Sequence, residues 1–157
     1  MKKISPCLWF DKDAEQAMNF YLSVFRDGKP GEILRYGENA PMPAGTVLTA
    51  AFEIEGMSFI ALNGGPHFRF NEAVSFSIDC RSQAEVDYFW DALTADGGQP
   101  SQCGWLKDKF GVSWQVVPAR MIELLKDSDP ARAQRAMQAM MTMTRIDIAT
   151  VEAAADG

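Results

Sequence analysis

The side chains best suited to acid–base or nucleophilic chemistry are one histidine and one cysteine. An imidazole at His67, at the mouth of a cavity, would act as a general acid or base. We favour an exposed loop histidine instead, because no carboxylate is spaced to orient the ring. Cys103 lies close in sequence to Lys107 and Lys109, whose charges would favour a nucleophilic thiolate. A small buried thiol is the simpler interpretation of Cys103, since free cysteine is among the most buried residue types.

Metal ligands are scarce. Zinc, iron and copper centres usually use two or more imidazoles or a cluster of thiolates, and this chain has one histidine and three cysteines. Cys7, Cys80 and Cys103 are odd in number and show no C-x-x-C spacing, which predicts reduced thiols in a cytoplasmic protein. No G-x-G-x-x-G turn joins a strand to a helix, as a Rossmann-type cofactor site would require. We therefore expect neither a metal nor another cofactor.

The overall charge excludes two classes of partner. The 157 residues carry 15 Lys+Arg against 21 Asp+Glu, a net charge of −6. With no basic stripe to neutralise phosphates, we expect no nucleic acid and no anionic membrane surface as partner. The 47% hydrophobic content is enough for the core of a single domain over residues 1–157, and no run of about 18 apolar residues predicts a membrane span.

The elements that must position these residues come twice. Ala14-Glu15 recurs 70 residues later as Ala84-Glu85, and Gly28-Lys29-Pro30 recurs as Gly98-Gln99-Pro100. Recurrence in the same order at one offset predicts a duplicated module. We place the first module at 1–66, the second at 67–118 and a helical tail at 119–157, in which Asp129 and Pro130 are expected to be the N-cap and first residue of a helix.

Each module is predicted to run strand, helix, then further extended segments. The first helix carries an apolar stripe from Ala14 to Phe25 with Asp11 or Asp13 as its N-cap, and Ser82 to Glu85 has the spacing of a capping box. A tight turn at Glu55-Gly56 would place Phe52 opposite Phe59. The predicted extended segments are 4–10, 31–36, 46–55 and 57–63 in the first module and 74–78, 102–106 and 112–117 in the second.

Both faces of the first sheet are mostly apolar, so both need cover, from helices on one side and from a cavity or the second module on the other. Trp105 and Trp114 would line a cavity for an apolar ligand or fill the core, and the sequence does not choose between these. Strand alternation places Ser113 and Gln115 on one face and Trp114 on the other.

Together with the tandem modules, four stretches carry a family resemblance: Asn63-Gly64-Gly65-Pro66, 70–76, 103–118 and the tail 126–155. They resemble the PhnB-like branch of the vicinal oxygen chelate superfamily of glyoxalases, extradiol dioxygenases and antibiotic-resistance proteins, a branch often labelled 3-demethylubiquinone-9 3-methyltransferase. The resemblance implies an α+β fold, in which tandem β-α-β-β-β modules form curved mixed sheets around a cavity, followed by a C-terminal helical tail.

The resemblance also implies where a divalent metal would be held. Superfamily enzymes take ligands from the first and last strands of each module, and those positions fall near Pro6, with Ser5 and Cys7 beside it, and at Asn63, Ala73 and Gln115. None of these is His, Asp or Glu, and neutral amide oxygens are weak ligands without charged companions. We therefore expect that the usual metal site is absent. In the same geometry Gln115 would point into the cavity beside Asn63 and Ser75, either to orient a ligand or simply to pair with them.

The tail holds five of the nine methionines, which suit both adaptable interfaces and irregular cores. We favour a tail helix that packs across the interface of a homodimer, with cover of its own chain as the second interpretation.

The leading function hypothesis is a metal-independent cytoplasmic protein that binds a small, largely apolar molecule in the cavity between the curved sheets. One alternative is an enzyme, a lyase, isomerase or transferase, that uses Cys103 or His67. Another is a dimeric interaction module. The residues expected to bind the ligand are Asn63, Ser75, Trp105, Ser113 and Gln115.

Overall fold

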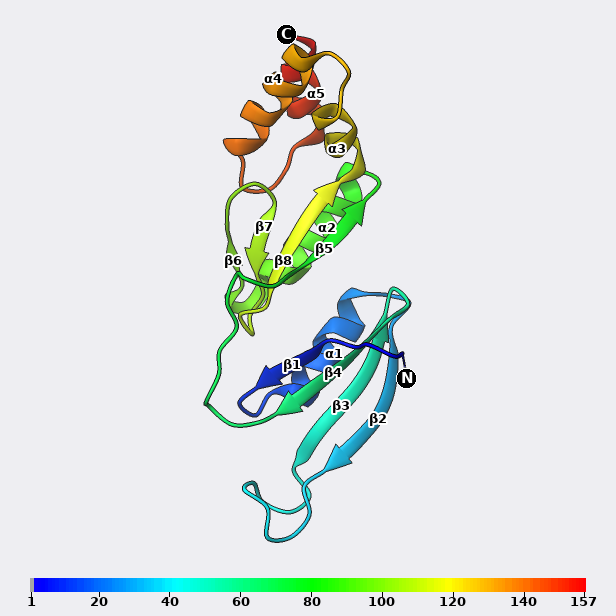
Figure 1. Ribbon diagram of the computed structural model, residues 1–157, viewed down its shortest axis with the longest axis vertical. Coiled ribbons are helices and arrows are strands. Elements are labelled where there is room, and N and C mark those ends of the chain that lie inside the picture. Colours follow the sequence, from blue (N-terminus) through cyan, green and yellow to red (C-terminus); the bar gives the residue numbers. More distant parts are fainter. Residues whose placement is uncertain (1) are drawn as a thin grey trace. The chain divides into compact units, whose positions relative to one another are not determined.

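The chain divides into two compact units, Met1–Phe70 (unit 1) and Asn71–Gly157 (unit 2), of which the computed structural model describes residues 2–157 (Figure 1). The predicted pair of modules corresponds to one sheet in each unit. No helix among residues 2–157 combines the length and the apolar character that a membrane span requires.

Unit 1 contains one sheet and one helix. Its elements are β1 (Cys7–Phe10), α1 (Ala14–Val24), β2 (Lys29–Arg35), β3 (Val47–Ile54) and β4 (Met57–Asn63). The strand order is β1-β4-β3-β2, with β1 parallel to β4 and the other pairs antiparallel. The predicted turn is confirmed: Glu55 and Gly56 have φ of 47° and 73°, and Phe52 lies opposite Phe59.

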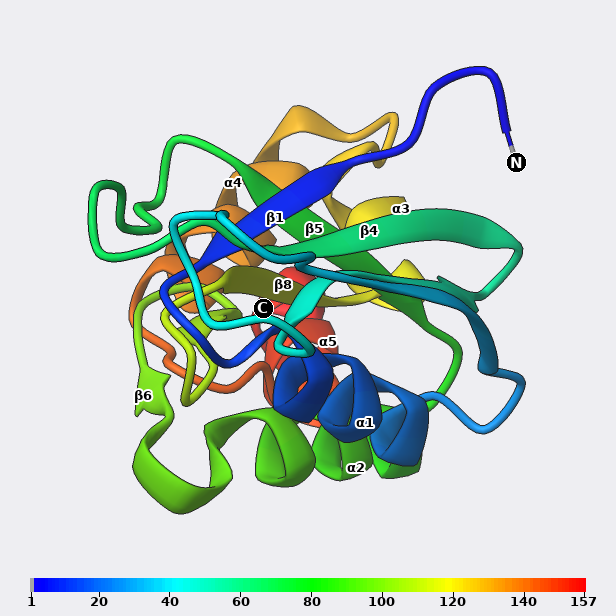
Figure 2. The same ribbon diagram turned by 90° about the horizontal axis from the view of Figure 1, so that it is seen from below.

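Helix α1 covers one face of this sheet, where it packs on β3 and β4 (Figure 2). Its buried stripe is Ala14, Ala17, Met18, Tyr21 and Val24, close to the stripe that the apolar spacing predicts. On the opposite face of the sheet Thr49, Ala51, Ile60 and Leu62 are half-buried.

Unit 2 repeats the same topology. Its sheet is built from β5 (Ser75–Cys80), β6 (Gln99–Pro100), β7 (Trp105–Lys107) and β8 (Ser113–Pro118), with α2 (Gln83–Thr94) and the 3-10 turn η1 (Ala95–Gly97) between β5 and β6. The order β5-β8-β7-β6, with β5 parallel to β8, matches the order in unit 1 strand for strand. The predicted tandem β-α-β-β-β fold is therefore confirmed.

The start of α2 also agrees with the sequence. The Ser82 hydroxyl accepts a hydrogen bond from the Glu85 N–H at 3.2 Å, as the capping box predicts. The Glu85 carboxylate reaches one residue further back and accepts from the N–H of Arg81 at 2.7 Å.

Strand β7 starts later than predicted, at Trp105 rather than at residue 102. Cys103 and Gly104 both have positive φ, 57° and 84°, and form a turn in place of extended chain. A Cβ on residue 104 would lie 2.8 Å from the carbonyl oxygen of Val116, so only glycine fits at this turn.

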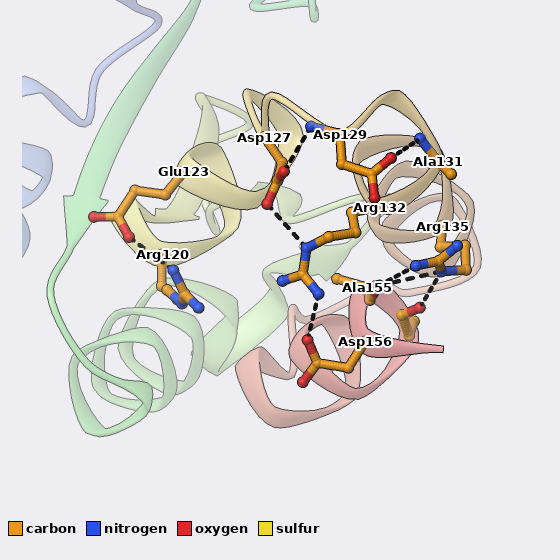
Figure 3. A network of polar contacts seen from close by, with 10 residues as sticks. Arg120, Glu123, Asp127, Asp129, Ala131, Arg132, Arg135, Ala155 and Asp156 are labelled. Atoms are coloured by element: carbon orange, nitrogen blue, oxygen red, sulfur yellow. Dashed lines mark hydrogen bonds and ion pairs between the residues drawn. The ribbon is translucent and has the colours of Figure 1, made fainter.

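The tail forms three helices that gather beyond the end of β8 (Figure 1): α3 (Ala119–Leu125), α4 (Pro130–Met141) and α5 (Ile148–Asp156). Asp129 caps α4, with Pro130 in its first turn, as predicted. Three arginines connect the helices, as Figure 3 shows in part: Arg120 pairs with Glu123 and Glu152, Arg132 with Asp127 and Asp156, and Arg135 donates to the carbonyls of Ala154 and Ala155. The buried apolar core of the tail consists of Met121, Leu124, Ala136, Ile146, Val151 and Ala155.

The tail is fastened to its own unit by backbone hydrogen bonds. The N–H groups of Cys103 and Gly104 donate to the carbonyls of Met143 and Thr144 at 2.8 and 2.7 Å. The Gln83 amide bridges to the tail, donating to Ile146 O and accepting from the N–H of Ile148. The structure thus shows the tail as cover for its own chain, and the predicted subunit interface through the tail stays a prediction.

Candidate functional site on the sheet of unit 2

The sheet of unit 2 carries two rows of mostly polar side chains on the face opposite α2. The first row crosses β6, β7, β8 and β5 at Gln99, Lys107, Ser113 and Ser75, and the second contains Trp105, Gln115 and Ser77. Residues paired directly across strands project to the same face, so these seven side chains form one surface, which we call the polar rows. Four of the five predicted ligand-binding residues lie there: Ser75, Trp105, Ser113 and Gln115.

A hydrogen bond links the two rows. Gln115 Nε2 donates to Ser75 Oγ at 3.0 Å, and both residues are half-buried. This contact is the mutual pairing that the sequence left as an alternative to ligand binding. The Gln115 amide has a second polar atom, its carbonyl oxygen, which can still orient a ligand.

Trp105 and Trp114 differ in role. Trp114 is buried on the α2 face, where its indole N–H donates to Asp108 Oδ2 at 2.9 Å and its ring packs against Phe76. Trp105 is half-buried among the polar rows. Trp114 is therefore a core residue, whereas Trp105 lies on the sheet face of the polar rows.

Ser113 is the most unusual member of the polar rows. It is 1% exposed, and its hydroxyl has no hydrogen-bond partner among the described residues. An unsatisfied buried hydroxyl costs about 1–3 kcal/mol, so it calls for an explanation. Ser113 lines a pocket of about 160 Å³ whose other walls are Glu72, Gln99, Pro100, Ser101, Trp105, Leu106 and Lys107.

An ion pair lies in the wall of this pocket. The Lys107 ammonium contacts the Glu72 carboxylate, and its hydrogen bond holds the pKa of that carboxyl below its usual value. Glu72 was missed by the sequence reasoning, and Lys107 was considered only as a neighbour of Cys103. The available signal was the strand register, which places Lys107 directly opposite Ser113.

Asn63, the fifth predicted residue, is in unit 1 and is 5% exposed. Its Oδ1 accepts a hydrogen bond from the N–H of Ala14 at 2.9 Å, and its Nδ2 donates to Val47 O at 3.0 Å. The side chain of Asp13 makes no capping hydrogen bond, so the predicted aspartate cap of α1 is wrong and Asn63 takes that role.

The two candidates for catalysis lie away from this pocket. His67 is exposed in the loop after β4 and lines a different pocket of about 440 Å³, in unit 1, with Trp9 and Tyr36. Cys103 is half-buried in the positive-φ turn before β7. Lys107 is paired with Glu72, and Lys109 lies 5.6 Å from the centre of the Phe110 ring.

The positions that the superfamily uses for a metal offer poor donors. Among residues 2–157 no three His, Cys, Asp or Glu side chains are grouped so that they could hold an ion. The side chains of Pro6 and Ala73 have no donor atoms, the Asn63 Oδ1 already accepts a hydrogen bond from the N–H of Ala14, and the Gln115 carbonyl oxygen is a neutral, weak ligand. This donor set does not fit a divalent cation.

Two mixed four-stranded sheets, each built as β-α-β-β-β with the same strand order, define a glyoxalase-like fold. Within that class, the chain belongs to the 3-demethylubiquinone-9 3-methyltransferase family, whose sequence profile matches residues 2–117. The tail after residue 117 lies outside the match.

Solved structures share the fold, and one of them supports the family assignment. A PhnB protein from Bacillus cereus is 35% identical, with 75% of this chain and all of that chain covered and a TM-score of 0.68. A protein from Pseudomonas aeruginosa is 23% identical over 75% of this chain and 98% of its own, with a TM-score of 0.60. A genomically encoded fosfomycin resistance protein from Listeria monocytogenes shares the fold at 14% identity, over 76% of this chain and 93% of its own, with a TM-score of 0.53. No curated protein matches the sequence.

Proposed function

We propose that this protein is a cytoplasmic, homodimeric binder of a small, largely apolar molecule, and that it binds without a metal. The ligand would lie on the polar rows of unit 2. The observation that carries the proposal is the buried Ser113 hydroxyl, which lacks a partner among the described residues and lines a pocket. A ligand atom that hydrogen-bonds to this hydroxyl would remove the cost of leaving it unsatisfied.

The surroundings of Ser113 suit a molecule with an apolar body. The Trp105 indole, which shares the sheet face of Ser113, supplies an apolar wall, while Gln99 and Ser101 supply polar groups that can orient a ligand. Neither Cys103 nor His67 is among the described residues that line this pocket. That placement favours binding over a reaction that uses either side chain.

A thermal-shift screen of small metabolites, neutral and charged, tests this proposal. A ligand present at 100 times its Kd should stabilise the protein by about 2.7 kcal/mol. We expect hits with wild-type protein treated with chelator, and smaller shifts for the same compounds with Trp105→Ala and Ser113→Ala. Ser58→Ala is the matched control, because Ser58 occupies the corresponding strand position in unit 1.

Three results would contradict the proposal. The first is a screen that yields no hit, and the second is hits that disappear after chelator treatment. The third is hits that respond to Ser58→Ala as strongly as to Ser113→Ala.

A further inference from the structure

The two members of the ion pair at the unit 2 pocket are held very differently. Lys107 projects from β7 between its strand neighbours Gln99 and Ser113, and its side chain is 34% exposed. Glu72 lies in the turn before β5, and its side chain is 61% exposed. The ammonium is therefore fixed by the sheet, whereas the carboxylate can leave at little cost, because exposed ion pairs contribute at most about 1 kcal/mol.

Unit 1 shows that the fold does not require a lysine at this position. The corresponding row on β2, β3 and β4 contains Lys29, Glu53 and Ser58. Glu53 thus occupies in unit 1 the position of Lys107 in unit 2, with the opposite charge. Ser58 corresponds to Ser113 but is only half-buried. Unit 1 also has a buried hydroxyl without a partner among the described residues, Ser5 Oγ, but the lysine that shares its pocket, Lys29, is exposed. A half-buried lysine directly opposite a buried unpartnered hydroxyl is found in unit 2.

We propose that the unit 2 pocket binds the carboxylate of a small ligand between the Lys107 ammonium and the Ser113 hydroxyl, in place of the Glu72 carboxylate. This inference rests on the proposed function and names the ligand class for the same site. One carboxylate oxygen accepts from the Ser113 hydroxyl and the group pairs with the ammonium, a charge-assisted arrangement stronger than neutral hydrogen bonds. The apolar body of the ligand packs beside the Trp105 indole.

The size of the pocket limits the ligand. A volume of about 160 Å³ equals that of about five water molecules at roughly 30 Å³ each, which suits a molecule as small as benzoate. In this arrangement Glu72 is a carboxylate of the protein that competes with the ligand for the same ammonium. Removing its charge should strengthen binding, and removing the charge of Lys107 should weaken it.

The test is an NMR titration of the full chain with three probes that share one ring: benzoate, benzamide and phenylphosphonate. We expect benzoate to shift the Trp105 indole and the amides of β7 and β8, and benzamide to bind at least about tenfold more weakly. Phenylphosphonate separates a carboxylate site from a general phosphate site. If phenylphosphonate binds more tightly than benzoate, the carboxylate assignment is overturned.

Variants assign the effect to named residues. Lys107→Met should lower benzoate affinity at least about tenfold and Lys107→Arg should retain most of it, while Glu72→Gln should raise the affinity about fivefold. Ser113→Ala should lower it about fivefold. Glu53→Gln in unit 1 and Lys109→Met on the exposed β7–β8 turn are the matched controls, and both should leave benzoate binding unchanged.

The outcomes separate this inference from the proposed function. Equal binding of benzoate and benzamide, unaffected by Lys107→Met, would leave a binding site for neutral ligands and overturn only the carboxylate inference. Weaker binding by Glu72→Gln would show Glu72 to be a ligand contact, and would overturn the inference even if Lys107→Met failed to fold. Absence of binding by every probe, together with an empty metabolite screen, would overturn both.

Discussion

The Asn63 side chain at the end of β4 accepts a hydrogen bond from the backbone N–H of Ala14, 49 positions earlier in the chain, at the start of α1. The same amide donates to Val47 O on β3. One buried side chain thus joins the first helix of unit 1 to two strands of its sheet.

Replacing this residue should destabilise the protein. Asn63→Ala removes the cap of α1 and leaves the buried carbonyl of Val47 without its side-chain donor, so the free energy of unfolding should fall by about 2–3 kcal/mol. Urea denaturation monitored by circular dichroism measures this loss. Asn19→Ala on the exposed face of α1 is the control and should change stability by less than about 0.5 kcal/mol. A loss no larger than that of the control would show that the cap is energetically unimportant.

The tail core should be equally sensitive. Ile146 is fully buried between the tail helices and the rest of unit 2. Ile146→Ala should cost about 2–5 kcal/mol through lost burial and the cavity left behind. Hydrogen exchange at the Cys103 and Gly104 amides should speed up, since both donate to the adjoining tail carbonyls. Met141→Ala, at a residue 62% exposed, should change neither quantity.

Acid should weaken the tail. The hydrogen bond from the Asp129 N–H is the main cause that lowers the pKa of Asp127, and a hydrogen bond from Arg132 is the second. Hydrogen bonds from Thr150 lower the pKa of Asp147. Because both folded-state pKa values lie below the unfolded value of about 3.9, the stability they supply is present above that pH. It is lost as pH falls through the folded values. Urea midpoints between pH 2 and 6 measure this.

The variants Asp127→Asn and Arg132→Met should both make stability depend less on pH in acid, since each removes one member of the Asp127–Arg132 ion pair. An unchanged slope in both would exclude Asp127 as its source.

The three thiols should react unequally. Burial, assisted by the nearby charges of Glu85 and Asp79, raises the pKa of Cys80 to about 12, whereas Cys7 is exposed. Maleimide at pH 8 followed by peptide mass mapping should modify Cys7 first and Cys80 only after unfolding. Because the folded pKa is raised, the contribution of Cys80 to stability is complete below about pH 8.5 and is lost as pH rises toward 12. Early labelling of Cys80 in native protein would contradict its placement.

The homodimer prediction can be tested together with the tail. Light scattering after size-exclusion chromatography should give twice the 17.4 kDa mass of one chain. If α4 forms the interface, Met141→Glu should produce monomers, because Met137 and Met141 are its exposed large apolar residues. A dimer that survives Met141→Glu would place the interface elsewhere, and a wild-type monomer would remove the prediction altogether.

Local signals predicted most of the fold. The apolar stripe of α1, the Ser82 capping box, the Glu55-Gly56 turn and the Asp129-Pro130 helix start are all encoded within a few residues, and all are confirmed. Strand alternation also placed Ser113 and Gln115 on one face.

The errors and omissions depend on contacts between distant residues. Asn63 caps a helix 49 positions away, and Gly104 must be glycine because the carbonyl of Val116 approaches it. Glu72 lies 35 residues before Lys107 in the chain, and the two meet because β5 and β7 both pair with β8. A spacing rule that applies within one helix or strand cannot predict contacts between residues this far apart in the chain.

The hydrogen bonds between the Cys103-Gly104 turn and the α4–α5 connection also determine where this protein can be divided. The family match ends at residue 117, just before the tail helices begin. A chain cut at that point would leave two turn amides without acceptors and would expose the part of unit 2 that Ile146 covers. The boundary of the sequence family is therefore not a boundary of folding, and a truncation chosen from the family match would remove part of a cooperative unit.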